Sequence, residues 1–205
     1  MKIMVCLRQI GGANAVVPVA RSLKESGNNV VFYSQGVAYQ RFCSDLPLVS
    51  ADSIEPDKAL DWFSPDVVVS ECVAPEENTI IPRRIVASAK GRGIFVVVVQ
   101  DFWASGLSVV WESMPDIMCV QDKLAKELVE KAWPGIAGGR VVITGQPAFN
   151  HLRGVDCDDA RNNLRAMYDL KEDWPIIHYS GGFKGIAESV ACLLEMIIIK
   201  VAVAV

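Results

Sequence analysis

The clearest indication of the fold class is the run IFVVVV, residues 94–99. It is apolar at every position, whereas a strand with one face in water alternates apolar and polar side chains. Strands that are apolar throughout are buried on both faces, as they are in parallel sheets whose two faces are covered by helices. The run therefore predicts an α/β protein built on a parallel sheet.

Further runs rich in β-branched residues have the length of strands. They are KIMVCL (2–7), NVVFYS (29–34), DVVVS (66–70), DIMCV (116–120), RVVIT (140–144) and PIIHYS (175–180). Helical patterns separate most of them, as in NAVVPVARSLKESG (14–27), where four apolar side chains share one helix face and Gly27 ends the helix. The alternation predicts a doubly wound, Rossmann-like parallel sheet.

The order of these runs predicts two domains. Residues 1–150 supply six strands, enough for one complete Rossmann-like domain, and residues 151–174 are rich in charge and are expected to form a linker helix. Residues 175–205 then supply a strand, a glycine turn and a helical pattern, the first βα unit of a second Rossmann-like domain. The rest of that domain, about 150 residues, is expected to be absent, as in a truncation, a fragment or a split subunit.

Composition excludes several classes of function. The net charge is −4 and no basic cluster is present, which argues against a nucleic-acid partner. The apolar tail LLEMIIIKVAVAV (193–205) is interrupted by charges, and the sequence indicates no transmembrane segment. Six widely spaced cysteines and two isolated histidines, His151 and His178, indicate neither a metal site nor a disulfide framework, so we expect a cytoplasmic protein without metal or cofactor.

Ligands of open parallel sheets bind beyond the carboxyl ends of the strands, so the loops there supply the candidate site residues. After the first strand, Gly11 and Gly12 allow a tight turn and Asn14 is expected to cap the next helix, although a plain βα turn is the equal alternative. This loop is not GxGxxG and does not predict nicotinamide binding, and SGGFKG (180–185) lacks the spacing of a P-loop.

Two carboxylates at strand ends are candidate catalytic groups. Glu71 follows the run at 66–70, where it could meet a ligand hydroxyl or act as a base. Asp101 and Trp103 follow the run at 94–99, and a carboxylate beside an aromatic ring is a common way to hold a sugar; a packed tryptophan with a capping aspartate remains the alternative. Gly145 and Gln146, before Pro147, predict a rigid turn at a substrate-binding position.

Taken in order, these segments resemble the GT-B glycosyltransferases, especially the branch of the peptidoglycan lipid II glycosyltransferase, lipid A disaccharide synthase and the UDP-GlcNAc 2-epimerases. The segments are the glycine turn near residue 11, PDVVVS (65–70), PDIMCVQDKLAKELVEKAWPG (115–135), RVVITGQPAFNHL (140–152) and PIIHYSGGFKG (175–185). The resemblance implies two Rossmann-like domains facing each other, the first holding the acceptor and the second a nucleotide sugar. It matches the first glycine loop to the acceptor side, and Ser180, Gly181 and Gly182, with Lys184, to the donor diphosphate.

The resemblance implies the acceptor-side half of a nucleotide-sugar-dependent glycosyltransferase, inactive until a donor domain completes it. Its ligands would be a UDP-sugar and a sugar or lipid-linked acceptor. The alternatives are a sugar-nucleotide 2-epimerase-like protein and a non-catalytic partner subunit. The apolar residues of 193–205 additionally predict a homo-oligomer or a separate donor-domain partner.

Overall fold

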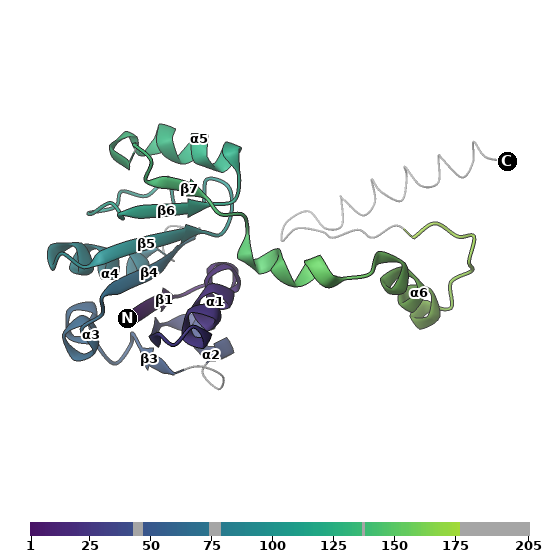
Figure 1. Ribbon diagram of the computed structural model, residues 1–205, viewed down its shortest axis with the longest axis horizontal. Coiled ribbons are helices and arrows are strands. Elements are labelled where there is room, and N and C mark those ends of the chain that lie inside the picture. The colour runs from purple at the N-terminus through teal and green to yellow at the C-terminus, as the bar shows by residue number, and fades with distance from the viewer. Residues whose placement is uncertain (43–46, 74–78, 137, 177–205) are drawn as a thin grey trace. The chain divides into compact units, whose positions relative to one another are not determined.

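A computed structural model of the chain describes residues 1–42, 47–73, 79–136 and 138–176. Its centre is one parallel sheet with the strand order β3-β2-β1-β4-β5-β6-β7 (Figure 1). This order confirms the doubly wound α/β fold, because the chain moves outward from β1 in one direction and then in the other. The strands are β1 (Lys2–Leu7), β2 (Asn29–Ser34), β3 (Leu48–Ser50), β4 (Val67–Cys72), β5 (Phe95–Gln100), β6 (Ile117–Val120) and β7 (Val141–Ile143).

Six of these strands were predicted within residues 1–150, and β3 was not. β3 is only three residues long and partly buried, so it leaves no long apolar run in the sequence. It pairs with β2 through Phe32 and Leu48 at the edge of the sheet. β4 also extends further than predicted, so that Glu71 lies within the strand and not behind it.

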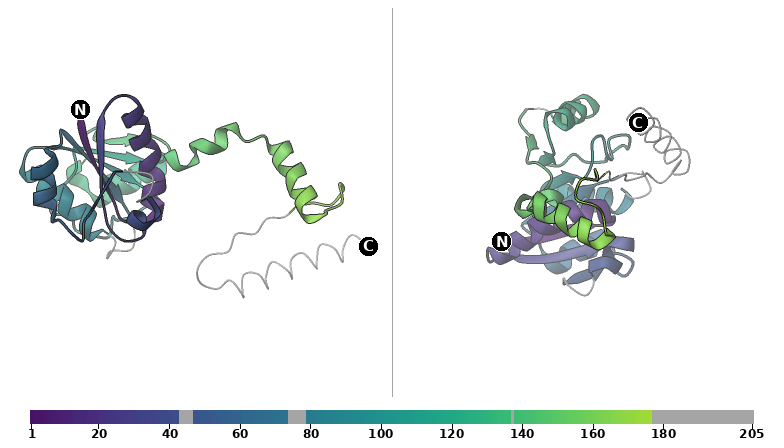
Figure 2. Two further views of the ribbon diagram at one scale, coloured as in Figure 1. Left: turned by 90° about the horizontal axis from the view of Figure 1, so that it is seen from below. Right: turned by 90° about the vertical axis from the view of Figure 1, so that its right-hand side faces the viewer.

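Helices cover the sheet unequally on its two faces. α1 (Ile10–Glu25) and α2 (Gly36–Phe42) pack on one face, and α3 (Pro56–Phe63), α4 (Ile80–Gly91) and α5 (Lys123–Ala132) on the other. Figure 2 shows α1 on one side of the sheet, with the blue helices on the other. The larger core lies under α3, α4 and α5, and α1 buries its Val16, Val17 and Ala20 against the opposite face.

α1 corrects the expectation of a glycine turn capped by Asn14. The helix begins at Ile10, so Gly11 and Gly12 lie in its first turn, and Asn14 is an exposed residue of the helix. The helix starts early because a carboxylate from β4, described below, accepts hydrogen bonds from the backbone just before it. Its end was predicted correctly: Gly27, with φ +84°, stops the helix just after Glu25.

Two Pro-Asp pairs tie the amino ends of neighbouring strands together. Asp66, just before β4, accepts a hydrogen bond of 2.7 Å from the backbone N–H of Lys2 at the start of β1. Asp116, just before β6, accepts a hydrogen bond of 2.8 Å from the backbone N–H of Val96 in β5 and one of 2.5 Å from the Lys90 ammonium group. These bonds help to fix the register that brings the carboxyl ends of the central strands to one edge.

Ser64 ends α3 in the left-handed conformation, with φ +50°. This conformation is strained for serine, whereas glycine adopts it without strain, so the serine lowers the stability of the folded state. We expect Ser64→Gly to raise the free energy of unfolding by about 0.5–1 kcal/mol in urea denaturation. The matched control is Ser26→Gly at the end of α1, where φ is −77° and no such gain is expected. Equal effects at both sites would contradict the explanation.

The chain divides into two compact units, Met1–Gly154 and Val155–Val205. The first ends with β7 and the 3₁₀ segment η3 (Pro147–Gly154), and a shorter 3₁₀ segment, η2 (Pro134–Ile136), follows α5. In the second unit, α6 (Cys157–Tyr168) is capped by Asp156, which accepts from the N–H groups of Asp158 and Asp159. Among the described helices, none is long and apolar enough to cross a membrane.

Several predictions concern residues outside the described ranges. They are most of the strand at 175–180, with His178, the diphosphate loop of Ser180, Gly181, Gly182 and Lys184, and the apolar tail at 193–205. The assignment of 175–205 to a donor domain therefore stays a prediction, as does the linker at 151–174.

Candidate functional site at the carboxyl edge of the sheet

Glu71 is a buried carboxylate at the carboxyl end of β4. Its side chain has no exposed surface, and one oxygen, Oε1, accepts hydrogen bonds from the backbone N–H groups of Arg8 at 2.6 Å and Gln9 at 2.9 Å. Burial raises the pKa of Glu71 to about 8, although the hydrogen bonds from Gln9 and Arg8 act in the opposite direction. The second oxygen, Oε2, has no hydrogen-bond partner among the described residues.

Gly11 and Gly12 let two carboxylates approach the first turn of α1. A Cβ atom added to Gly12 would lie 2.7 Å from both Cβ and Cδ of Glu71, and one added to Gly11 would lie 2.8 Å from Oδ2 of Asp101. Neither glycine has a positive φ. These glycines are therefore required by the close approach of side chains from β4 and β5, not by a turn of the backbone.

Asp101 follows β5 and lies beside Glu71 at the same edge. It is only partly buried, and burial raises the pKa of its carboxyl group. Its backbone carbonyl accepts a hydrogen bond of 2.6 Å from Nε2 of Gln146, which follows β7. The structure thus brings together Glu71, Asp101 and Gln146, which are far apart in the sequence.

An aromatic-walled cavity of about 250 Å³ opens next to Asp101. Three of its walls are half-exposed or exposed aromatic rings: Phe102 and Phe149 are 61% and 62% exposed, and Trp103 is 42% exposed. Trp103 stands edge-on to Phe102, and its indole N–H donates to Asp122 over 2.9 Å. Asp101, Gln121 and Gln146 supply the polar part of the lining. A fixed aromatic ring beside amide and carboxylate groups suits a ligand with one apolar face and several hydroxyls.

Buried polar atoms without a partner gather at this edge. Within the described ranges there are six of them, and all six belong to residues at or just beyond the carboxyl ends of β1, β2, β4, β5 and β6: Arg8 Nε, Ser34 Oγ, Glu71 Oε2, Gln100 Oε1, Asp101 Oδ1 and Gln121 Oε1. Folded proteins leave few buried polar atoms unpaired, and each one calls for an explanation. Because all six lie at one edge of the sheet, we take this edge as the candidate site, where water or a ligand could supply the missing partners.

Several residues of this edge were not predicted from the sequence. Nη1 of Arg8 donates a hydrogen bond to Gln35, whose amide nitrogen donates to Asp52. Gln121 donates a hydrogen bond of 2.9 Å to the backbone carbonyl of Gln100. The signal that would have found them is position alone, because Arg8, Gln35, Gln100 and Gln121 each end or follow a strand. Their residue types carry no motif.

The remaining predicted site residues stand apart from the cavity or are undescribed. Asn14 lies within α1 and faces solvent, so its capping role is wrong. Gly145 has φ +78° and precedes Gln146, as expected for a turn out of the sheet. Among the described residues, no group of three or more His, Cys, Asp or Glu side chains is arranged to hold a metal.

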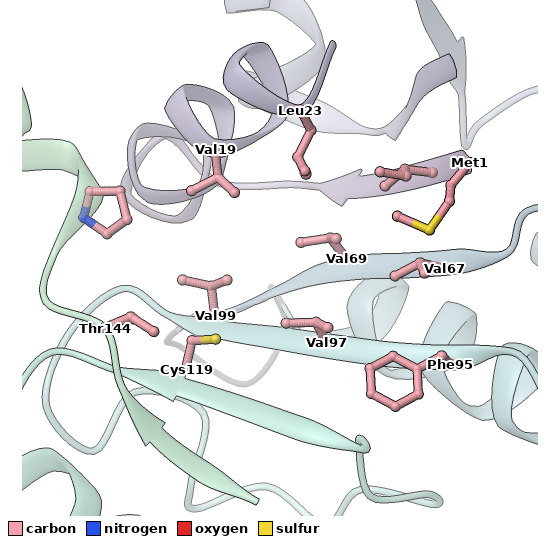
Figure 3. A pocket seen from close by; sticks show the side chains of 12 residues that line it. Met1, Val19, Leu23, Val67, Val69, Phe95, Val97, Val99, Cys119 and Thr144 are labelled. Carbon is pink, nitrogen blue, oxygen red and sulfur yellow. The ribbon is translucent and has the colours of Figure 1, made fainter. Parts of the chain in front are cut away.

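A second cavity, of about 340 Å³, differs in character. Figure 3 shows Val19 and Leu23 of α1 on one side and Val69, Val97 and Val99 of the sheet forming the floor. Its lining is apolar, and it lies on the sheet face against which α1 packs. Apart from Cys119 and Thr144 its lining residues are hydrophobic, and it contains no carboxylate or amide side chain, so we take the polar edge as the candidate site.

Comparisons with known proteins support the fold. No family model and no curated protein matches the sequence. Among solved structures, the chain is similar to the UDP-GlcNAc 2-epimerase of Methanocaldococcus jannaschii, with 17% identity, a TM-score of 0.60 and coverage of 82% of this chain and 52% of that one. A glycosyltransferase of Rickettsia africae shares 14% identity, with a TM-score of 0.58 and coverage of 90% and 54%.

A UDP-N-acetylglucosamine 2-epimerase of Rickettsia bellii is also similar, with 11% identity, a TM-score of 0.54 and coverage of 83% and 52%. The chain therefore spans about half the length of these structures. At such identities the likeness concerns the fold alone. It confirms the expectation that the chain has a GT-B-like fold, matched over part of its neighbours' length.

Proposed function

We propose that residues 1–154 form the acceptor-side domain of a nucleotide-sugar-dependent glycosyltransferase, whose donor is held by a second domain. The observation that carries the proposal is the set of unpartnered polar atoms at the carboxyl edge of the sheet, beside an aromatic-walled cavity. The shared fold with a solved glycosyltransferase supports it. In this proposal the domain alone transfers nothing.

Asp101 is the group that would face an acceptor hydroxyl. It lines the cavity, its Oδ1 is unpartnered, and burial raises the pKa of its carboxyl group, which brings a carboxylate nearer to the range of a general base. Glu71 has no exposed surface and binds the backbone before α1, so we assign it a positioning role. It holds the start of α1 against the ends of β4 and β5.

The proposal predicts that Trp103 contacts a sugar ring. Saturation-transfer NMR with N-acetylglucosamine should detect binding to the 205-residue chain. Trp103→Ala should weaken this binding by about 5- to 30-fold, since loss of one stacking face costs roughly 1–2 kcal/mol. The control is Trp62→Ala, because Trp62 is an exposed tryptophan of α3, 61% accessible, that does not line the cavity. Equal binding by both variants would place the sugar elsewhere.

A sugar-nucleotide 2-epimerase-like protein is the second candidate, favoured by the fold shared with two UDP-GlcNAc 2-epimerases. The two candidates differ in the ligand that would bind beside Asp101. It is a free acceptor sugar in the transferase and the sugar ring of the nucleotide sugar itself in the epimerase. The same NMR measurement with UDP-N-acetylglucosamine separates them. Trp103-dependent binding of the nucleotide sugar, without binding of the free sugar, would favour the epimerase.

Further parts of the proposal concern the surroundings of this domain. Ser180, Gly181, Gly182 and Lys184 are proposed to hold the donor diphosphate, and the apolar tail at 193–205 to form a homo-oligomer or bind a donor-domain partner. A cytoplasmic location belongs to the same proposal, because the spacing of the six cysteines in the sequence does not indicate a disulfide framework.

A further inference from the structure

The edge of the sheet also indicates which class of acceptor it selects. We propose that the start of α1 and the cavity beside Asp101 select an uncharged, hydroxyl-bearing ligand and reject one that carries phosphate there. This inference rests on the proposed function, because it narrows the acceptor from a sugar or lipid-linked acceptor to a neutral sugar or polyol.

The first observation is that Glu71 already uses backbone donors that an anion would need. A helix N-terminus binds phosphate through the free N–H groups in and just before its first turn. Here the N–H groups of Arg8 and Gln9 both donate to Oε1 of Glu71, which is fully buried. The protein's own carboxyl group thus uses two of the backbone donors that an anion at this helix start could bind.

The second observation is that two carboxyl groups touch the first turn of α1. Oδ2 of Asp101 fills the space that a Cβ atom on residue 11 would need, and the side chain of Glu71 fills the corresponding space at residue 12. An anion that approached this turn would lie beside Asp101, and repulsion between like charges a few ångströms apart exceeds the attraction of a helix dipole. The glycines therefore admit carboxyl groups of the protein and not a phosphate.

The third observation is the kind of unpartnered atom at the edge. Of the six buried unpartnered atoms, Arg8 Nε is a donor, but Arg8 does not line the cavity. The unpartnered atoms of the lining residues Asp101 and Gln121, Oδ1 and Oε1, are hydrogen-bond acceptors, and so is Oε1 of Gln100. The side-chain amide nitrogens of the two glutamines each donate a hydrogen bond within the protein: that of Gln121 to the Gln100 carbonyl and that of Gln100 to the carbonyl of Ser105. Ionised phosphate offers only acceptors and satisfies none of these oxygens, whereas each hydroxyl of a sugar can donate to one.

A pair of probes that differ only in the phosphate tests the selection: N-acetylglucosamine and N-acetylglucosamine 1-phosphate, with inorganic pyrophosphate as a third. Each is titrated into the ¹⁵N-labelled 205-residue chain while the amide signals of Gly11, Asp101 and Gln121 and the indole signal of Trp103 are followed. We expect the neutral sugar to shift these signals and to bind at least about tenfold more tightly than its phosphate. Pyrophosphate should leave them in place.

Asp101→Asn supplies the decisive variant, because it keeps the shape of the side chain and removes its charge. It should narrow or reverse the preference, by strengthening binding of the sugar phosphate relative to the neutral sugar. Asp57→Asn is the control: it changes the net charge by the same amount on α3, where Asp57 pairs with Arg92. The preference should be unchanged in that variant.

The outcomes separate the inference from the proposed function. If the sugar phosphate or pyrophosphate shifts the signals of Gly11 and Asp101 as strongly as the neutral sugar does, the selection is wrong while a carbohydrate site remains. If no probe shifts any of these signals, the inference and the acceptor site both fail. A preference for the neutral sugar that Asp101→Asn leaves unchanged would also overturn the role given to Asp101.

Discussion

Replacing Gly12 with alanine is expected to lower the free energy of unfolding by about 2–3 kcal/mol. The new methyl group would lie 2.7 Å from both Cβ and Cδ of Glu71, closer than carbon atoms approach in folded proteins. Glu71 cannot move aside easily, because β4 is paired with β1 on one side and with β5 on the other. Displacing its carboxyl group would also break the hydrogen bonds from Arg8 and Gln9.

Two other glycines make this prediction specific. Gly91 is the last residue of α4, and a Cβ atom there meets nothing within 4 Å, so Gly91→Ala should stabilise the protein by up to about 1 kcal/mol. At Gly11 the nearest atom is Oδ2 of Asp101, the end of a partly exposed side chain that can rotate. Gly11→Ala should therefore lower the free energy of unfolding by less than Gly12→Ala does. Urea denaturation of the three variants measures the order, and a Gly12 variant as stable as the Gly91 variant would refute the close approach.

The fold could be predicted because its signal is carried by residue type. The apolar run 94–99 and the other runs rich in β-branched residues indicate the parallel sheet, because strands of such sheets are largely buried on both faces, although Phe95 at the start of β5 is 47% exposed. β3 was missed because three residues, partly buried, leave too short a pattern. The apolar cavity beside α1 could not be foreseen either, because the sequence of a strand does not say which of its faces has a helix upon it.

The candidate site could be predicted only in part. Glu71 and Asp101 were found because carboxylates at strand ends are informative, and their closeness follows from the strand order. The role of the glycine pair was misread, because a pair of glycines in sequence indicates a turn or a close approach equally well. Only the positions of Glu71 and Asp101 against α1 decide between these two readings. Gln100 and Gln121 carry no motif, and their unpaired oxygens become visible only when the neighbours are placed.

The buried carboxyl group of Glu71 should also make the stability of the protein depend on pH. Its pKa rises from 4.5 to about 8 on folding, mainly because burial penalises the charged form. Between these values the folded chain binds a proton that the unfolded chain has released, so stability falls as the pH rises through this range. The contribution is complete below pH 4.5 and is lost once the pH has passed about 8.

The groups around Glu71 do not obscure this window. The thiols of Cys6 and Cys72 interact with it, but burial raises the pKa of both thiols well above their usual value, so they stay neutral. The charge of Asp101 raises the pKa of Glu71 further and that of Arg8 lowers it, and both contributions are smaller than that of burial. Burial also raises the pKa of Asp101, which adds to the slope in the same direction, so the contribution of Glu71 is measured as the difference between the parent and a variant that lacks only the Glu71 carboxyl group.

Glu71→Gln isolates this effect, because glutamine keeps the shape and one accepting oxygen for Arg8 and Gln9 but has no proton to lose. At pH 4.5 the variant and the parent should be similarly stable, whereas at pH 8.5 the variant should be more stable by on the order of 4 kcal/mol. Glu25→Gln, on the exposed last residue of α1, should follow the parent at every pH. Guanidinium denaturation across this range gives the curves, and a constant difference between parent and Glu71→Gln would mean that Glu71 is ionised throughout in the folded protein. In that case it would hold the start of α1 as a charged group, and the neutral-ligand selection at this edge would rest on two negative charges instead of one.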